Sequence, residues 1–241
     1  MNRILFERGE IDDGIVTFRD VRAEHVLNVL HGEVGQTLKT GEIGGKIGEA
    51  EIVAIADGAV TVRVTHDREP LPSWVDLVLA PPRPRAMKRL LPQLATMGVG
   101  RIFLVGAKKV EKDFWGATLL KAENYRPLLV DGLMQGGVAT EMPVVETRRN
   151  LRKFIREELD GLFGASRKVI AHPYGEGADG CADGSDGRRL LLAVGPEGGW
   201  TDEEVALFEA HGFVRYSLGR RILRTDTALI SLLAKLDRDN R

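Results

Sequence analysis

Residues 190–204 read LLLAVGPEGGWTDEE, and this stretch decides the fold. The five apolar residues 190–194 are typical of a strand buried on both faces, and a glycine-rich turn joins them to a helix. Thr201 fits the N-cap of that helix, and Glu204 three residues later completes a capping box. A buried strand that leads directly into a helix predicts an α/β sheet.

The same alternation of strand and helix extends outward over most of the chain. It predicts a mostly parallel sheet covered by helices on both faces. Ligands of such sheets bind beyond the carboxyl ends of the strands, so the loops after Val194 and Ser217 are the first places to expect a site. The expected strands are 75–80, 101–105, 142–146, 168–172, 190–194 and 214–217, and the expected helices lie within 85–97, 117–134, 150–159, 202–211 and 226–236.

The first 70 residues have a different texture. Short strands at 14–18, 37–40, 46–55 and 59–65, with one helix at 23–30, favour a small β-barrel. The segment EPLPS at 69–73 has the prolines and polarity of a linker. We therefore expect two domains, 1–72 and 73–241.

Composition excludes several classes of protein. The 241 residues include a single cysteine, Cys181, which leaves no internal disulfide and no Cys-rich metal site. No apolar run approaches the roughly 20 residues of a membrane-spanning helix. We expect a soluble, cytoplasmic protein that binds no metal and no membrane.

Charge is distributed unevenly along the chain. Residues 71–130 carry 10 Lys and Arg against 4 Asp and Glu, whereas residues 1–70 carry 8 against 13. A local basic excess is typical of a region that contacts phosphates, although a solvated helix face explains the charge equally well. The proposed RNA contacts, called the basic cluster below, are Arg83, Arg85, Lys88 and Arg89.

Two loops carry the chemistry. The glycine loop, residues 195–200 (GPEGGW), gives close access to the backbone because glycine has no side chain, while an acidic Glu197 within the turn disfavours a pyrophosphate ligand. The arginine loop, residues 218–224 (LGRRILR), places an apolar Ile-Leu pair among three arginines. An exposed apolar pair is unfavourable, so we expect a purine ring, a partner subunit or the protein's own core to shield it from water.

The pairing of GPEGG at 195–199 with LGRRILRTDTA at 218–228 resembles the RsmE family of 16S ribosomal RNA uridine-N3 methyltransferases, in the SPOUT class. The resemblance implies a PUA-like, RNA-binding N-terminal barrel and a SPOUT-type α/β domain with a C-terminal trefoil knot. It implies S-adenosylmethionine (SAM) as cofactor, the small ribosomal subunit as partner, and a homodimer paired through the knot region. The substrate would be a uridine in 16S ribosomal RNA on the assembled subunit.

The chemistry of base methylation suggests the catalytic candidates, and the resemblance assigns the cofactor contacts by position. Arg221 and Arg224 would stabilise the deprotonated base, with Glu197 or Asp226 as a polar partner; as an alternative, Asp226 is only a helix N-cap. His172 ends a predicted strand and is a weak further candidate. The implied cofactor contacts are Leu192, Val194, Gly195, Pro196, Glu197, Gly198, Gly199, Leu218, Gly219, Ile222, Leu223, Arg224, Thr227 and Ala228.

Other hypotheses stay open. The chain departs from the family pattern at His31, Met97 and Met134, which leaves room for a catalytically silent or differently targeted RNA- or ribosome-binding protein of the same fold. The glycine loop alone is compatible with an unrelated nucleotide-binding protein. Residues 175–187 have Asp and Gly in a spacing that suggests calcium, although a surface insertion explains them better.

The last helix supports the expected homodimer. Its apolar residues between 228 and 236 exceed the single stripe that a helix on one sheet face buries. We therefore expect Leu233 to lie in an interface between subunits.

Overall fold

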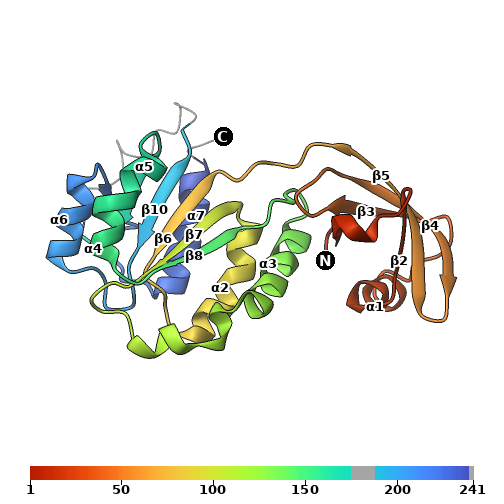
Figure 1. The fold of residues 1–241 in the computed structure, drawn as a ribbon, viewed down its shortest axis with the longest axis horizontal. Helices are drawn as coiled ribbons and strands as arrows, with labels where there is room; N and C mark the ends of the chain where they lie inside the picture. Colours follow the sequence, from red (N-terminus) through yellow and green to blue (C-terminus); the bar gives the residue numbers. More distant parts are fainter. Residues whose placement is uncertain (175–187, 239–241) are drawn as a thin grey trace. The chain divides into compact units, whose positions relative to one another are not determined.

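The computed structural model describes residues 1–174 and 188–238 (Figure 1). Contacts divide the chain into two compact units, Met1–Ser73 with Val130–Met142, and Trp74–Leu129 with Pro143–Arg241. The calcium hypothesis for residues 175–187, which include Cys181, concerns a segment outside the described residues.

The first unit contains a five-stranded sheet in the order β1-β3-β4-β5-β2. β1 pairs with β3 in parallel, and the other neighbours are antiparallel. Alternate residues of β4 are buried in a core shared with α1. Its elements are β1 Ile4–Phe6, η1 Arg8–Glu10, β2 Ile15–Phe18, α1 Val21–Asn28, β3 Thr37–Glu42, β4 Ile47–Ala56 and β5 Ala59–Arg68.

The helix α1 begins two residues earlier than predicted because Asp20 is its N-cap. The Asp20 side chain accepts a hydrogen bond from the backbone N–H of Arg22. The Arg22 guanidinium in turn binds the carboxylates of Asp20 and Glu10, and these hydrogen bonds hold the pKa of both carboxyl groups below their usual values. The PUA-like character of this unit stays a prediction.

Residues 130–142 cluster with the first unit, although the sequence pattern places them in the second domain. Arg3 is buried, and its guanidinium donates hydrogen bonds to the carbonyl oxygens of Gly137 and Thr40, each at 2.6 Å. The backbone N–H of Arg3 donates to the carbonyl of Met134. The first unit is therefore assembled from two separate segments of the chain.

The second unit contains a six-stranded sheet in the order β11-β9-β10-β6-β7-β8, and every neighbouring pair is parallel. The predicted α/β class is confirmed. β6 and β10 are buried on both faces, which explains the continuous apolar run of β10. The apolar run of β6 is interrupted by Asp76, which is buried and pairs with Arg101 and Arg189. The strands are β6 Val75–Leu79, β7 Val99–Val105, β8 Val144–Arg148, β9 Arg167–Ala171, β10 Leu190–Val194 and β11 Val214–Tyr216.

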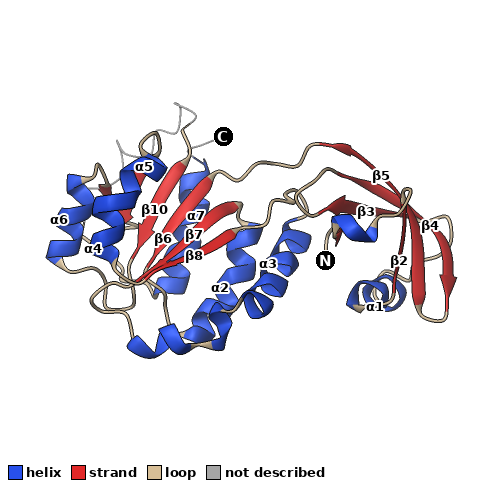
Figure 2. Ribbon diagram, viewed as in Figure 1, coloured by secondary structure: helices blue, strands red, loops and turns tan. Residues whose placement is uncertain are grey.

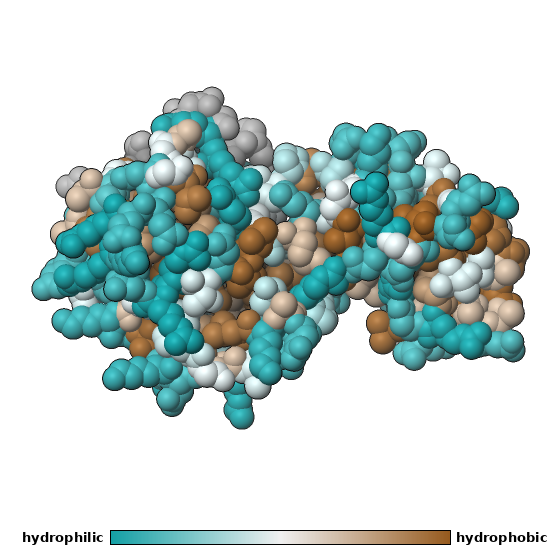
Figure 3. Space-filling view, in the orientation of Figure 1, coloured by the Kyte–Doolittle hydropathy of each residue, from teal (hydrophilic) through white to brown (hydrophobic). Residues whose placement is uncertain are grey.

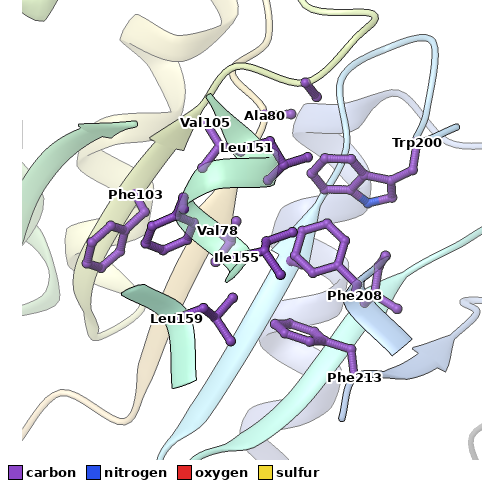
Figure 4. Close-up of a cluster of buried hydrophobic side chains, with 14 of the residues drawn as sticks. Val78, Ala80, Phe103, Val105, Leu151, Ile155, Leu159, Trp200, Phe208 and Phe213 are labelled. Carbon is purple, nitrogen blue, oxygen red and sulfur yellow. The ribbon is translucent and has the colours of Figure 1, made fainter. Parts of the chain in front are cut away.

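Helices cover both faces of this sheet (Figure 2). On one face, α4 and α6 pack against alternate residues of the central strands, with Trp200 against Phe208 (Figure 4). α2 and α7 contact each other and carry further buried apolar side chains. The elements are α2 Pro84–Thr96, η2 Lys112–Gly116, η3 Thr118–Leu120, α3 Ala122–Gly136, α4 Leu151–Phe154, η4 Ile155–Leu159, α5 Asp160–Phe163, α6 Asp202–Ala210 and α7 Thr225–Arg238.

The last helix, α7, corrects one expectation. Leu233 is 0% exposed and lies in the core of its own chain, as do Leu229, Leu232 and Leu236. The prediction that Leu233 lies in a subunit interface is wrong, because one chain already buries it. The trefoil knot stays a prediction.

Over the residues that the structure describes, no helix is long and apolar enough to cross a bilayer.

Candidate functional site

A pocket of about 450 Å³ lies at the carboxyl ends of β9, β10 and β11. Ala171, Val194 and Tyr216, the last residues of these three strands, line its base. The glycine loop and the arginine loop form its walls. This is the sheet edge where the order of parallel strands predicts a ligand site.

The glycine loop is held from several directions. The N–H of Gly199 donates to the carbonyl of Pro196 at 2.8 Å, and Gly199 has φ +67°, a conformation that favours glycine. The ammonium of Lys109 donates to the carbonyl of Gly198 at 2.7 Å. The carboxylate of Glu197 accepts a hydrogen bond from the N–H of Arg83 at 3.2 Å. The backbone of this wall is therefore fixed before any ligand binds.

The loop then enters α6 through the predicted capping box, which is confirmed. The Thr201 side chain accepts from the N–H of Glu204, and the Glu204 side chain accepts from the N–H of Thr201. Glu204 also accepts from the N–H of Lys108 at 2.8 Å. A single buried carboxylate thus joins the start of α6 to the segment that follows β7.

The arginine loop is more exposed. Ile222 is 76% exposed and Leu223 38%, although both line the pocket. Gly219 has φ +110° and its N–H donates to the hydroxyl of Ser217 at 3.1 Å. The hypothesis that the protein's own core covers the apolar pair is therefore wrong for Ile222. The pair is available to a ligand or a partner.

Most of the predicted cofactor contacts line this one pocket. Three do not: Leu192 is buried within β10, and Arg224 and Thr227 lie outside the lining. Of the proposed catalytic residues, Arg221 and Glu197 line the pocket. The predicted residues in the lining are Val194, Gly195, Pro196, Glu197, Gly198, Gly199, Leu218, Gly219, Arg221, Ile222, Leu223 and Ala228.

Arg224 and Asp226 are engaged elsewhere. Arg224 lies 3.5 Å from the carboxylate of Asp226, and Arg89 reaches the same carboxylate at 3.4 Å. The N–H of Thr227 also donates to Asp226 at 3.0 Å. α7 begins at Thr225, so Asp226 lies in the first turn of the helix and the N-cap alternative for this residue is wrong. Its carboxylate instead holds two arginines at the start of α7.

The basic cluster lies on α2 and at its N-terminus. Arg83 pairs with Glu111 at 3.0 Å and Arg89 pairs with Asp226. Arg85 and Lys88 are exposed. None of the four is among the residues that line the pocket within the described part of the chain.

Sequence reasoning missed part of the lining, including Lys109, Pro173, Tyr174 and Asp202. The signal for Pro173 and Tyr174 was available, since they follow β9 at the same sheet edge. His172, named as a weak candidate, lines the pocket, and its Nδ1 lies 2.6 Å from the carbonyl of Tyr174.

Comparisons with known proteins agree with this geometry. The RNA methyltransferase domain family matches residues 69–237. Ribosomal RNA small subunit methyltransferase E of Treponema pallidum (strain Nichols) is 32% identical over 239 residues, which cover 97% of this chain and 90% of the relative.

Two solved structures resemble the whole chain. A methyltransferase from Legionella pneumophila, in complex with the bound cofactor SAM, is 27% identical with a TM-score of 0.73 and covers 98% of this chain and 97% of that one. Ribosomal RNA small subunit methyltransferase E from Neisseria gonorrhoeae, bound to S-adenosyl methionine, has a TM-score of 0.77 at 21% identity, with 99% and 97% covered, and shows the fold alone. The matched domain and the full-length similarity place the chain in the RNA methyltransferase domain family and, within it, in the ribosomal RNA small subunit methyltransferase E (RsmE) family.

Proposed function

We propose that the protein uses SAM to methylate N3 of a uridine in 16S ribosomal RNA, on the assembled small subunit. The observation that carries this proposal is that the two loops which carry the family resemblance line a single pocket. The names of the relatives support ribosomal RNA of the small subunit as the substrate.

The pocket suits SAM in size and chemistry. Its volume of about 450 Å³ is typical of cofactor sites. Ile222 and Leu223 offer an apolar surface for a purine, and the carboxylates of Glu197 and Asp202 suit a cationic ligand. SAM, when bound, supplies a methyl group activated by a sulfonium.

The protein's own residues would orient the uracil and stabilise its anion. The N3 of uridine is a poor nucleophile until it loses its proton, so a cation beside the base lowers the barrier. Arg221 lines the pocket and is the proposed cation, with Glu197 as its polar partner. Arg224 is proposed to act through Asp226, with which it pairs.

The rest of the RNA would be held by charge. Base methylation in folded RNA requires the target base to leave its stack while the flanking backbone is bound. We assign this role to Arg83, Arg85, Lys88 and Arg89, and we assign further RNA contacts to the PUA-like first unit.

The test is methyl transfer from labelled SAM to small ribosomal subunits that lack the modification, compared with naked 16S RNA. We expect transfer to the subunit, at N3 of one uridine, and its loss in Arg221→Gln with SAM binding retained. No binding of SAM in calorimetry would exclude the proposal.

The alternative of a silent protein gains no support from the three departures. The carbonyl of Met97 accepts a hydrogen bond from the indole of Trp74 at 2.7 Å, and the carbonyl of Met134 accepts from Arg3. His31 is exposed with φ +50°. Within the described residues, none of the three lines the pocket, so the departures leave the proposed cofactor site unaltered.

We also propose a homodimer paired through the C-terminal region. The exposed Ile222 and Leu218 in the arginine loop support an apolar contact there. Sedimentation equilibrium is expected to give twice the 26.5 kDa of one chain. A monomer that still methylates RNA would exclude the dimer.

A further inference from the structure

A second hollow, of about 300 Å³, lies beside the pocket. It is formed where β7 and β8 end and where α4 and α6 begin. Lys108, Arg149 and Arg152 line it, with Thr201 and Glu204. Lys108 belongs to the basic region 71–130, and no sequence pattern indicates a site here.

Tight backbone contact builds this hollow. The N–H of Gly106, just after β7, donates to the carbonyl of Arg148 at 3.0 Å. A Cβ on Gly106 would lie 2.0 Å from the carbonyl oxygen of Arg149, so only glycine fits. This approach keeps the chain after β7 beside the chain after β8, and it brings Lys108 and Arg149 to one hollow.

The hollow presents cations. Lys108, Arg149 and Arg152 are exposed, and in the described part of the chain no partner is found for the Lys108 ammonium. Arg152 pairs with Glu203 at the surface. Arg149 lies 5.8 Å from the ring of Trp115, an aromatic surface beside the hollow.

The buried carboxylate of Glu204 reduces the positive charge of the hollow only weakly. Glu204 accepts hydrogen bonds from the N–H of Lys108 and the N–H of Thr201, each at 2.8 Å, and from the Thr201 hydroxyl at 3.0 Å. Its charge is therefore stabilised by donors of the protein itself. Figure 3 shows mainly hydrophilic residues over α4 and α6, as expected for a surface that meets a charged ligand.

The hollow and the pocket share two short segments. Lys109 lines the pocket and Lys108 the hollow; likewise Trp200 lines the pocket and Thr201 the hollow. Consecutive residues thus face the two spaces. A polyanion whose base enters the pocket has its backbone next to Lys108, Arg149 and Arg152.

We propose that the second hollow binds the RNA backbone phosphate next to the methylated nucleotide. This inference rests on the proposed function. It assigns to RNA a surface different from the basic cluster, because α2 lies on the opposite face of the sheet from α4 and α6 (Figure 1). Phosphates there would position the strand without reading its sequence.

The test compares two charge-matched variants. Arg149→Gln with Arg152→Gln removes two cations of the hollow, and Lys153→Gln with Arg156→Gln removes two exposed cations of the same helical segment outside it. The probes are a labelled single-stranded RNA oligonucleotide and small ribosomal subunits. Inorganic phosphate at equal ionic strength distinguishes a phosphodiester strand from a free anion.

For the hollow variant, we expect RNA affinity to fall about tenfold and the slope of log affinity against log salt to decrease by about 1.4, which corresponds to two lost phosphate contacts on a single strand. KM for small subunits should rise while kcat and SAM affinity stay unchanged. The Lys153 and Arg156 control should keep wild-type values, and inorganic phosphate should not compete at millimolar concentration.

Equal RNA affinity and equal salt slopes in the two variants would overturn the inference. So would binding of inorganic phosphate to the hollow of the wild-type protein together with unchanged RNA affinity in the Arg149 and Arg152 variant, since the site would then hold a free anion. If the wild-type protein fails to bind SAM, the proposed function fails, and the RNA comparison between the two variants still decides this inference by itself.

Discussion

The glycine loop is held by hydrogen bonds from Lys109 and Arg83, whereas the arginine loop across the same pocket leaves Ile222 mostly exposed. One wall is fixed by the protein alone. The other carries apolar side chains that the described protein does not cover. A fixed wall lowers the entropic cost of binding, and an uncovered wall gains stability only when a ligand or partner reaches it.

Because only the glycine loop is fixed by the protein, substitutions in the two loops should have different effects on stability and ligand binding. Changes in the glycine loop should affect the folded protein and its ligand together, because the loop is part of the packing around α6. Changes in the arginine loop should affect the ligand and the proposed subunit contact, and should leave the folding of the single chain unchanged.

The largest effect is expected from Gly198→Val, which should weaken SAM binding about 100-fold, or roughly 3 kcal/mol. A Cβ at Gly198 would lie 3.0 Å from Cδ of Lys109, so a branched side chain displaces the lysine that holds the loop. Calorimetry measures the affinity. Gly116→Val is the control, because a Cβ there meets nothing within 4 Å. Wild-type affinity in Gly198→Val would remove the glycine loop from the site.

Bound SAM should lower the rate of trypsin cleavage in the arginine loop about tenfold. Arg220, Arg221 and Arg224 are exposed, so trypsin should cleave there in the free protein. SAM should slow this cleavage, as followed by mass spectrometry, and should leave cleavage at Lys46 in the first unit unchanged. Equal cleavage rates with and without saturating SAM would mean that the loop does not close on the cofactor.

Ile222→Ser should weaken SAM binding about fivefold, because it removes apolar area that the purine would cover. The free energy of unfolding should change by less than about 0.5 kcal/mol, since the side chain is exposed in the free protein. Denaturant unfolding and calorimetry on the same sample measure both. A large loss of stability would show that the loop is packed in solution.

Thr201→Ala should lower stability and leave SAM binding nearly unchanged, the reverse of Ile222→Ser. Loss of the capping box is expected to lower the free energy of unfolding by about 1 kcal/mol and to reduce SAM affinity by less than about threefold. Thr201→Ser keeps the hydroxyl and should restore stability. An unchanged melting temperature in the alanine variant would contradict the role of the cap.

The parts of the site that the sequence predicted are local ones. The strand at 190–194, the capping box of Thr201 and Glu204, and the edge of the sheet where the loops lie all follow from patterns within about 15 residues. Apolar runs, cap residues and turn glycines determine the structure of residues next to them in the sequence. A single sequence is therefore enough to predict these features.

The missed features depend on contacts between distant segments. Lys109 lies 89 residues from Gly198 in the sequence, and their contact depends on the order of strands in the sheet. Nothing in the pattern around Lys109 indicates that order. The same reason explains why Arg149 and Lys108 could not be assigned to one hollow, and why Leu233 was placed in an interface rather than in the core.

The two-segment first unit has a consequence for the growing chain. Arg3 emerges from the ribosome early, yet its acceptor Gly137 and the carbonyl of Met134 are made only after the first segment of the second unit, Trp74–Leu129. Within residues 1–73 the Arg3 guanidinium keeps the carbonyl oxygens of Thr40 and Gly48 as acceptors, but its Nε–H has no acceptor until Gly137 is made. An unpaired buried donor is unfavourable, so the amino-terminal strands should stay incomplete until residues 130–142 have emerged. A fragment that stops at Ser73 should therefore fail to reach the native state, and a separate peptide of residues 130–142 should help it fold.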